Sequence, residues 1–276
     1  MNIKLIALDL DGTLLTPEKK MTPRTRAALD AAAAQGIWVV PTTGRIYEGL
    51  PEFIRSLPYL RYVITVNGGQ VYDAVTREIL HKVYVPLDLA MQVYDYLDTL
   101  PVAYDCYLDG KGYMQREMLE HLGDYMPDDP HNLQMAVKIR QPLDDFKGYL
   151  RQVNRSLQKM QFFIADVSRR PALMRELERR FPELAVSFSM PHNVEINARK
   201  AVKGEGLRFL CKYLGIPLEQ AAAFGDGVND VTMLQTAGVG VAMANAEPEA
   251  LAAANYRTAS NAEDGVAQFL ERHVLK

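Results

Sequence analysis

LIALDLDGT, residues 5–13, is an apolar run that ends abruptly in two aspartates and a glycine. A short, continuous apolar run predicts a strand that is buried on both faces, as in a parallel sheet. Ligands of such sheets bind beyond the carboxyl ends of the strands. We therefore expect Asp9 and Asp11 to lie in a functional loop at the end of a buried strand.

The next part of the chain alternates between predicted helices and strands. Thr22 and Pro23 predict a helix start, because Thr can cap a helix and Pro fits its first position. Gly36 is expected to end that helix. Further expected elements are a strand at 37–40, a following helix that ends at Leu57, and a strand at 62–66. This alternation predicts an α/β fold with a Rossmann-like parallel sheet core.

The pattern changes at about Val83 and returns to alternation at about Val194. The residues between these points predict an independent α+β unit. Its expected elements are helices at 87–97, 143–156 and 171–181, β-structure at 103–115, 161–165 and 185–189, and a loop at 123–132. After it we expect a strand at 194–196, a helix at 203–214, strands at 221–224 and 239–243, and a helix at 263–273. The prediction is thus a discontinuous core, residues 1–83 and 191–276, with an inserted α+β unit, residues 84–190.

The composition restricts the classes of partner. The net charge is −3, whereas a general nucleic-acid-binding protein carries a basic face. No stretch approaches the roughly 18 apolar residues of a membrane span, and the apolar run near Met1 is too short for a signal peptide. Cys106 and Cys211 lie far apart in the sequence and indicate reduced thiols. We expect a cytoplasmic protein that binds neither nucleic acid nor membrane.

Asp9 and Asp11 stand at alternate positions, so their side chains point to the same side of an extended chain. Carboxylate oxygens are ligands that suit Mg²⁺, often together with substrate phosphate. One aspartate can also attack phosphorus, and the other can act as general acid and base. An acidic turn that only closes a strand explains the two residues equally well when they are considered alone.

Three further segments carry related chemistry, each at an expected strand end or helix start. GDGVND adds Asp226 and Asp230, and TTGR at 42–45 adds hydroxyls and backbone N–H groups that suit an anion. Lys203 can neutralise a phosphoryl group, although Lys200 competes for this role. Each segment alone has a plain explanation, as a solvated turn, a helix cap or a surface charge. Their conjunction in one domain predicts a phosphoryl-transfer site.

In order along the chain, these motifs resemble those of the haloacid dehalogenase (HAD) superfamily of phosphatases, in its Cof-type branch with a type IIB cap. The matching motifs are DLDGTLL at 9–15, TGR at 43–45, Lys203-Gly204, and FGDGVND at 224–230 with Met233-Leu234. Further marks are NGG at 67–69, AMANA at 242–246 and NAEDGV at 261–266. The chain departs from the family at Thr42, where a small residue such as Ala is more common, at Gly69, where Ala is usual, and throughout the inserted unit.

The resemblance implies a role for each residue. Asp9 would be the nucleophile and a Mg²⁺ ligand, Asp11 the general acid and base that gives the metal its backbone carbonyl, and Asp226 the remaining metal ligand. The phosphoryl group would be held by Leu10, Thr43, Gly44, Lys203 and Asn229. Supporting roles would fall to Asp230, Arg45 and Asn67. The inserted unit would be the cap, a lid that confers substrate specificity.

The function expected from this set is Mg²⁺-dependent hydrolysis of a small phosphorylated metabolite through an aspartyl-phosphate on Asp9. The substrate would be a phosphate monoester, such as a sugar phosphate, a nucleotide or a cofactor phosphate. Two alternatives stay open at this level. A phosphotransferase or phosphomutase of the same superfamily would pass the phosphoryl group to a sugar instead of water. A non-catalytic protein that binds a phosphorylated ligand would normally have lost an acid, and every motif acid is present here.

Overall fold

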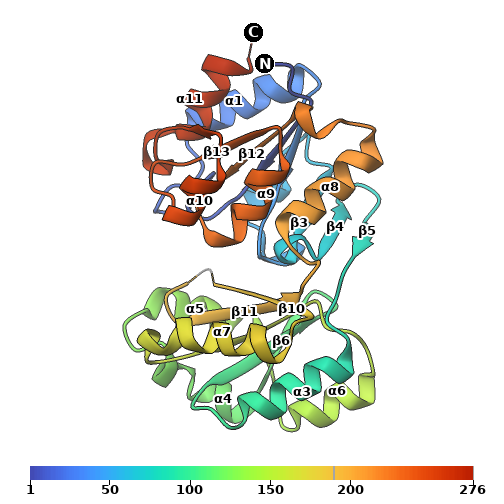
Figure 1. Ribbon diagram of the computed structural model, residues 1–276, viewed down its shortest axis with the longest axis vertical. Helices are drawn as coiled ribbons and strands as arrows, with labels where there is room; N and C mark the ends of the chain where they lie inside the picture. The colour runs from blue at the N-terminus through green and yellow to red at the C-terminus, as the bar shows by residue number, and fades with distance from the viewer. Residues whose placement is uncertain (189, 276) are drawn as a thin grey trace. The chain divides into compact units, whose positions relative to one another are not determined.

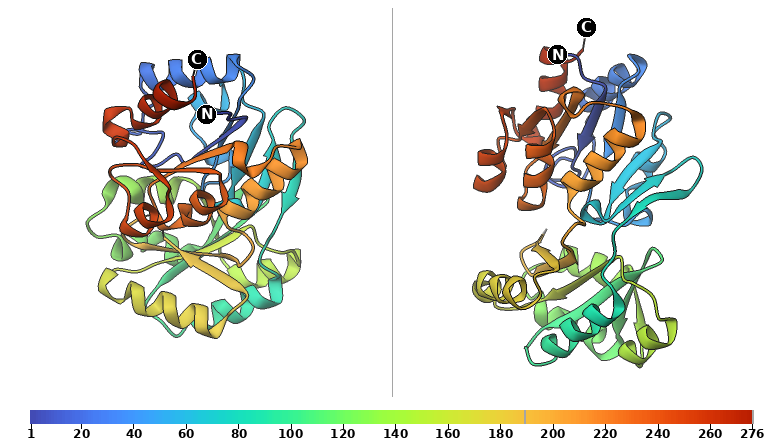
Figure 2. Two further views of the ribbon diagram at one scale, coloured as in Figure 1. Left: turned by 45° about the horizontal axis from the view of Figure 1, so that its top comes forward. Right: turned by 45° about the vertical axis from the view of Figure 1, so that its right-hand side comes forward.

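The computed structural model describes residues 1–188 and 190–275. The chain divides into two compact units, which Figure 1 and Figure 2 show from several directions. The first unit comprises residues 1–82 and 201–276, and the second comprises residues 83–200. The first unit is therefore discontinuous in sequence, and the second is inserted into it.

A parallel sheet of five strands organises the first unit, in the order β14-β13-β12-β1-β2. The strands are β1 (Leu5–Leu8), β2 (Trp38–Pro41), β12 (Ala221–Gly225), β13 (Val239–Ala242) and β14 (Tyr256–Arg257). Every neighbouring pair is parallel, so the carboxyl ends of all five strands lie at one edge. The predicted α/β class with a parallel sheet core is confirmed.

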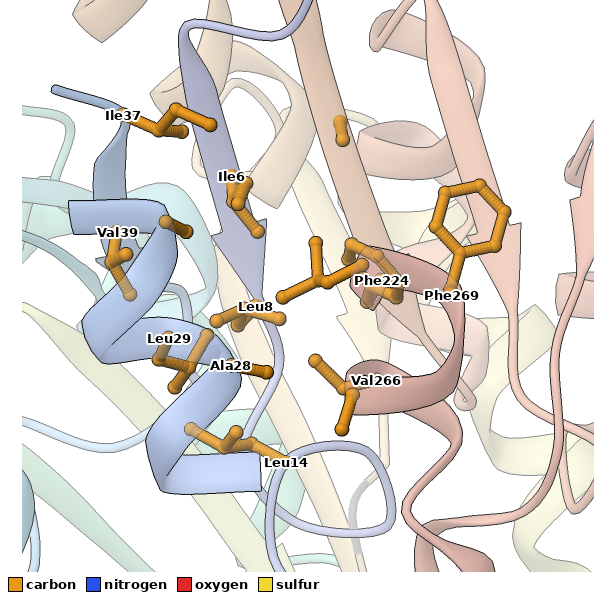
Figure 3. Packing of buried hydrophobic residues seen from close by; sticks show 14 of the residues in the cluster. Ile6, Leu8, Leu14, Ala28, Leu29, Ile37, Val39, Phe224, Val266 and Phe269 are labelled. Carbon is orange, nitrogen blue, oxygen red and sulfur yellow. The ribbon is translucent and has the colours of Figure 1, made fainter. Parts of the chain in front are cut away.

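Helices cover both faces of this sheet. On one face, α1 and α11 pack against Ile6, Leu8 and Phe224, as Figure 3 shows. On the other face, α8, α9 and α10 pack against Leu5 and Ala7. Alternate residues of β1 therefore face opposite layers, because side chains alternate along a strand. The helices are α1 (Pro23–Ala34), α8 (Lys203–Leu214), α9 (Val231–Thr236), α10 (Pro248–Ala253) and α11 (Gly265–His273).

The segment after β2 is less helical than expected. Instead of one helix that ends at Leu57, it contains a 3₁₀ turn, Tyr47–Gly49, and the short helix α2, Glu52–Arg55. Pro51 accounts for the interruption, since it has no backbone N–H and disfavours the helical conformation in the residue before it.

The strand expected at 62–66 is present, but it does not extend the parallel sheet as a full ladder. Among the described residues, a single parallel bridge, from Thr42 to Ile64, joins it to the segment after β2. The strand instead starts a separate antiparallel sheet of three strands. These are β3 (Tyr62–Thr65), β4 (Gln70–Asp73) and β5 (Glu78–Lys82). The cause is the tight turn after Thr65, which returns the chain at once beside β3.

A six-stranded sheet of order β10-β11-β9-β6-β7-β8 organises the second unit. Its strands are β6 (Ala103–Leu108), β7 (Lys111–Gln115), β8 (Arg140–Leu143), β9 (Lys159–Phe163), β10 (Leu184–Ser187) and β11 (Asn193–Ala198). Its helices are α3 (Leu87–Leu97), α4 (Arg116–Glu120), α5 (Pro130–Lys138), α6 (Phe146–Val153) and α7 (Arg170–Arg180). The adjacent residues Phe162 and Phe163 point to opposite faces: Phe162 packs with α3, α6 and α7, and Phe163 packs with residues of α5 and the segment before it.

The boundary between the units lies later than expected. The strand expected at 194–196, as the return of the core, is β11, which pairs antiparallel with β9 and β10 of the second unit. Its apolar residues Val194 and Ile196 pack in the hydrophobic core of that unit. The first unit therefore resumes at residue 201 and not at 191. A short apolar alternation fits a strand of either sheet, so the pattern alone placed it wrongly.

Two smaller differences concern the second unit. The loop expected at 123–132 contains the start of α5, which Asp129 caps by accepting a hydrogen bond from the backbone N–H of Asn132. The strand expected at 185–189 is β10, which ends at Ser187, and Ser189 lies outside the described residues. None of the helices in the described part of the chain is long and apolar enough to cross a membrane.

Candidate active site

Acidic residues that follow two neighbouring parallel strands meet at the carboxyl edge of the sheet. Asp9 follows β1, and Asp226 and Asp230 follow β12. One carboxylate oxygen from each of the three residues lies within 4.8 Å of the other two. Asp9 and Asp230 are almost fully buried, with 6% and 1% of their surface exposed. The strand order thus unites two acidic segments that are far apart in the sequence.

Lys203 is the cation of this cluster. It is the first residue of α8, and it is fully buried. Its Nζ donates to Oδ1 of Asp9 and to Oδ1 of Asp230, both at 2.6 Å. Burial alone would lower the pKa of the lysine, but the charges of Asp230 and Asp9 outweigh burial and raise it. Lys203 therefore remains an ammonium between two carboxylates.

The cluster still carries more negative than positive charge. Burial, together with the charges of Asp230 and Asp226, raises the pKa of Asp9 well above its usual value despite the nearby Lys203. Burial and the charge of Asp230 raise the pKa of Asp226 to about 6. Oδ2 of Asp9 is buried and has no hydrogen-bond partner in the described part of the chain. A buried excess of carboxylate oxygens fits a cation that takes oxygen ligands.

The turn after Asp9 holds Asp226 in place. Gly12 has a φ of +95°, and a Cβ at this position would lie 2.1 Å from Oδ2 of Asp226, so only glycine fits. Thr13 donates its hydroxyl to Oδ1 of Asp226 at 2.7 Å. Thr13 was not among the predicted site residues, although its position directly after the acidic turn is a signal that could have pointed to it.

Asp230 fixes its neighbours with both carboxylate oxygens. While Oδ1 accepts from Lys203, Oδ2 accepts the backbone N–H of Asp226 at 3.0 Å and that of Gly227 at 2.9 Å. These contacts give Asp230 a supporting position rather than one open to a ligand.

Thr43, Gly44 and Arg45 follow β2 in a bend, not at a helix start as expected, because the first helical turn begins at Tyr47. Thr43 is buried, and its hydroxyl accepts the backbone N–H of Arg45 at 3.2 Å. The N–H of Thr43 donates to the carbonyl of Ile64 at 2.9 Å. An anion at this loop would therefore meet the Thr43 hydroxyl without the dipole of a helix, while the N–H groups of Thr43 and Arg45 already donate within the protein.

Asp11 lies outside the three-carboxylate group, and its side chain is paired with two cations. Nε and Nη2 of Arg45 donate to its two oxygens at 2.9 and 2.8 Å, and Nζ of Lys19 donates at 2.9 Å. Burial raises the pKa of Asp11, but Arg45 and Lys19 outweigh this effect and lower it. Arg45 thus contacts Asp11 directly. Lys19 was not among the predicted site residues, because no local sequence pattern places this loop residue near Asp11.

The remaining predicted residues lie in the same unit. The side chain of Leu10 packs in the hydrophobic core, and its carbonyl accepts the N–H of Leu15 at 2.9 Å, so only its backbone N–H could meet a ligand. Nδ2 of Asn229 donates to Oδ1 of Asn67 at 3.1 Å. This contact joins the loop after β12 to the turn after β3.

The model of a protein family described as haloacid dehalogenase-like hydrolase matches residues 6–270. The chain belongs to this family. Two relatives from Bacillus subtilis match along nearly their whole length. The phosphatase YwpJ is 31% identical, over 99% of this chain and 100% of its own, and the 5-amino-6-(5-phospho-D-ribitylamino)uracil phosphatase YcsE is 30% identical, over 100% of this chain and 97% of its own.

The fold is similar to that of the HAD subclass IIB sugar phosphatase BT4131, with a TM-score of 0.82 and 24% sequence identity. The match covers 99% of this chain and 100% of that one. The resemblance inferred from the motifs, to the HAD superfamily, is confirmed, and so is the prediction that the chain is a hydrolase.

Lys203→Met is expected to lower the free energy of unfolding by about 3–5 kcal/mol, because removal of one partner leaves buried carboxylates uncompensated. The measurement is urea denaturation at neutral pH. Lys200→Met, at an exposed position three residues earlier, is the matched control and should change stability little. Equal stability of the two variants would show that Lys203 does not compensate Asp9 and Asp230.

Proposed function

We propose that the chain hydrolyses small phosphate monoesters with Asp9 as the nucleophile. One observation carries this proposal: the two oxygens of the Asp9 carboxylate have different surroundings. Oδ1 accepts a hydrogen bond from Lys203, whereas Oδ2 is buried and lacks a hydrogen-bond partner among the described residues. The first contact holds the side chain, and the second oxygen can attack a phosphorus atom.

The proposed reaction has two steps. In the first, an oxygen of Asp9 bonds to phosphorus, the bond from phosphorus to the ester oxygen breaks, and the leaving oxygen takes a proton from Asp11. In the second, Asp11 takes a proton from water, the water oxygen bonds to phosphorus, and the bond from phosphorus to Asp9 breaks. The products are an alcohol and inorganic phosphate, and both aspartates return to their initial states.

Asp11 can donate a proton only after it separates from its cations and takes one up from solvent, because Arg45 and Lys19 lower its pKa. Its side chain is 34% exposed, and those of Arg45 and Lys19 are 24% and 45% exposed. Ion pairs at this exposure are screened by water and contribute about 0–1 kcal/mol each. The separation therefore costs little, and a substrate that enters beside Asp11 can displace both cations.

Lys203, Thr43 and Asn229 are proposed to hold the phosphoryl group, together with the backbone N–H groups of Leu10 and Gly44. The buried ammonium of Lys203 is screened less than a surface charge, so it can stabilise negative charge in the transition state. Arg45, Asn67 and Asp230 are proposed to support these groups, by the contacts described above.

Asp9, Asp226 and the backbone carbonyl of Asp11 are proposed to hold Mg²⁺. The three carboxylates, which offer oxygens within 4.8 Å of one another around the single ammonium of Lys203, support this assignment. When bound, the ion would neutralise phosphoryl oxygens and offset the repulsion among the carboxylates. Asp230 is assigned no direct bond to the metal, because both of its oxygens already accept hydrogen bonds from neighbours.

The second unit is proposed to be the cap that selects the substrate. One face of its sheet carries the buried side chains of Asp105, Lys159, Gln161 and Glu195. Lys159 donates to Glu195 at 2.8 Å, Gln161 donates to Asp105 at 2.9 Å, and Arg140 also pairs with Asp105. The two cations and two carboxylates of this face therefore cancel in charge. A buried polar face without net charge suits the hydroxyl-bearing part of a ligand better than a second phosphate.

The proposed substrate is a small phosphorylated metabolite: a sugar phosphate, a nucleotide or a cofactor phosphate. The names of two similar proteins specify a ribitylaminouracil phosphate and a sugar. The cytoplasm stays the expected compartment, since Cys106 and Cys211 are both free thiols and buried.

Asp9→Asn is expected to reduce phosphate release by on the order of 10³-fold or more, because an amide is a poor nucleophile. The measurement is inorganic phosphate released, with MgCl₂, from a panel of sugar phosphates, nucleotides and cofactor phosphates. Asp30→Asn, at an exposed position of α1, is the control and should keep wild-type activity. Full turnover by a correctly folded Asp9→Asn protein would exclude Asp9 as the nucleophile.

Mg²⁺ at about a hundredfold excess over its Kd is expected to raise the Tm of the wild type by roughly 5–10 °C, because it binds only the native state. Asp226→Asn should lose this response, and chelation with EDTA should abolish it in the wild type. Without Mg²⁺ the Asp226→Asn protein should be at least as stable as the wild type, since burial and Asp230 disfavour the Asp226 carboxylate. An undiminished response of Asp226→Asn to Mg²⁺ would remove Asp226 from the metal site.

Asn197→Leu is expected to change the ratio of kcat/KM between sugar phosphates and p-nitrophenyl phosphate without a loss of Tm. Asn197 lies two residues after Glu195, on the same face of β11. Its buried Oδ1 has no hydrogen-bond partner among the described residues. Replacement of an unsatisfied polar atom by an apolar one should not destabilise the fold. A lower Tm with an unchanged ratio would mean that Asn197 serves the fold and not substrate selection.

A further inference from the structure

Three consecutive residues after β3 have left-handed backbone conformations. The φ angles are +54° at Val66, +53° at Asn67 and +94° at Gly68. Glycine and asparagine tolerate this region, but a β-branched residue such as valine is an outlier there. Strain of this kind persists only where the surroundings enforce it, and it concentrates at functional sites.

Connection of β3 to β4 does not require this strain. The register pairs Thr65 with Gln70, so the loop between the strands has four residues. Loops of this length most often contain a type I turn, whose central residues have negative φ. The left-handed valine must therefore be maintained by contacts outside the hairpin.

Backbone hydrogen bonds tie the turn to the loop that carries Thr43. The N–H of Val66 donates to the carbonyl of Arg45, and the N–H of Asn67 donates to the carbonyl of Thr43, both at 3.0 Å. The N–H of Thr43 in turn donates to the carbonyl of Ile64 at 2.9 Å. The position of the Thr43 hydroxyl, which is predicted to bind the phosphoryl group, thus depends on the backbone path of residues 64–67.

Close packing ties the same turn to the start of α8. A Cβ at Gly68 would lie 2.1 Å from the carbonyl oxygen of Val202 and 2.8 Å from the backbone nitrogen of Lys203. Gly206, one turn after Lys203 in α8, also packs against Gly68. A Cβ at Gly206 would lie 3.2 Å from Cα of Gly68. The turn therefore contacts α8 at the residue that donates to Asp9.

The side chain of Asn67 reaches a third segment. Its Oδ1 accepts the hydrogen bond from Nδ2 of Asn229 at 3.1 Å, and the residue is only 3% exposed. This hydrogen bond fixes the orientation of the Asn229 side-chain amide. The remaining polar atoms of Asn229 therefore point in a defined direction.

We infer that residues 66–68, which we call the brace, position Thr43, Lys203 and Asn229 relative to one another for phosphoryl binding. Asn67 is the positioning residue of the brace, and it acts through Asn229. The inference rests on the proposed function, because it assigns the brace to the phosphoryl site of that reaction. The strained backbone is retained because this path contacts all three segments at once.

The test begins with Asn67→Gly, which removes the side chain and leaves a residue that accepts the left-handed backbone. We expect the inhibition constant of inorganic phosphate and the KM of the best phosphate ester each to rise about tenfold, as for loss of one well-placed polar contact. Asn154→Gly is the matched control: Asn154 has φ +49°, is exposed and ends α6 in the second unit. It should leave both constants unchanged.

A double-mutant cycle separates positioning from a general loss of stability. If Asn67 acts through Asn229, then Asn67→Gly should change the phosphate inhibition constant less than twofold once Asn229→Ala is present. Unchanged constants for Asn67→Gly alone, or full additivity with Asn229→Ala, would overturn the inference. If Asn67→Gly does not fold, Asn67→Ser, whose side chain is too short to reach Nδ2 of Asn229, is measured by the same two criteria.

The result is distinguishable from failure of the proposed function. If the wild type neither releases phosphate from the ester panel nor binds inorganic phosphate, the proposed function fails and the brace has no such site to position. If the wild type is active and the Asn67 variants match it, the proposed function stands and the inference on the brace fails.

Discussion

The ammonium of Lys203, buried between the carboxylates of Asp9 and Asp230, is the interaction on which the rest of the site depends. An uncompensated buried charge costs several kcal/mol, so these acids can share a buried site only if a cation reaches them. Lys203 reaches them because α8 packs very closely on its neighbours. A Cβ at Gly204 would lie 2.5 Å from the carbonyl oxygen of Thr232, so glycine at this position permits the approach.

The parallel sheet provides the rigid support for this arrangement. Two layers of helices bury its faces, and its strand order places the ends of β1, β2 and β12 side by side. Left-handed conformations at Val66 and Asn67 cost of order 1–3 kcal/mol each, which such a core can tolerate. Chemistry is proposed for this unit and substrate selection for the second, whose sheet carries a polar face of its own around Asp105 and Glu195. Such a division would let one reaction serve different substrates.

Much of the candidate site could be predicted from the sequence, because its motifs combine a local conformation with a chemical group. Asp9 and Asp226 were expected at strand ends, and Lys203 at a helix start, and the structure has them there. The contacts of Asp11 with Arg45 and Lys19 could not be predicted in the same way. They depend on where a loop returns in space, and a loop has no periodicity from which that can be inferred.

The sequence by itself determined the apolar run of β1, the acids that follow it and the alternation of helices and strands, because these depend on side-chain polarity and local conformational preference. Only the tertiary structure decided that β11 belongs to the second unit, that β3 turns back to start its own sheet, and that Asn67 meets Asn229. Each of these depends on contacts between residues distant in the chain. A short strand of given polarity can pair in several sheets, and the packing of the whole unit selects one of them.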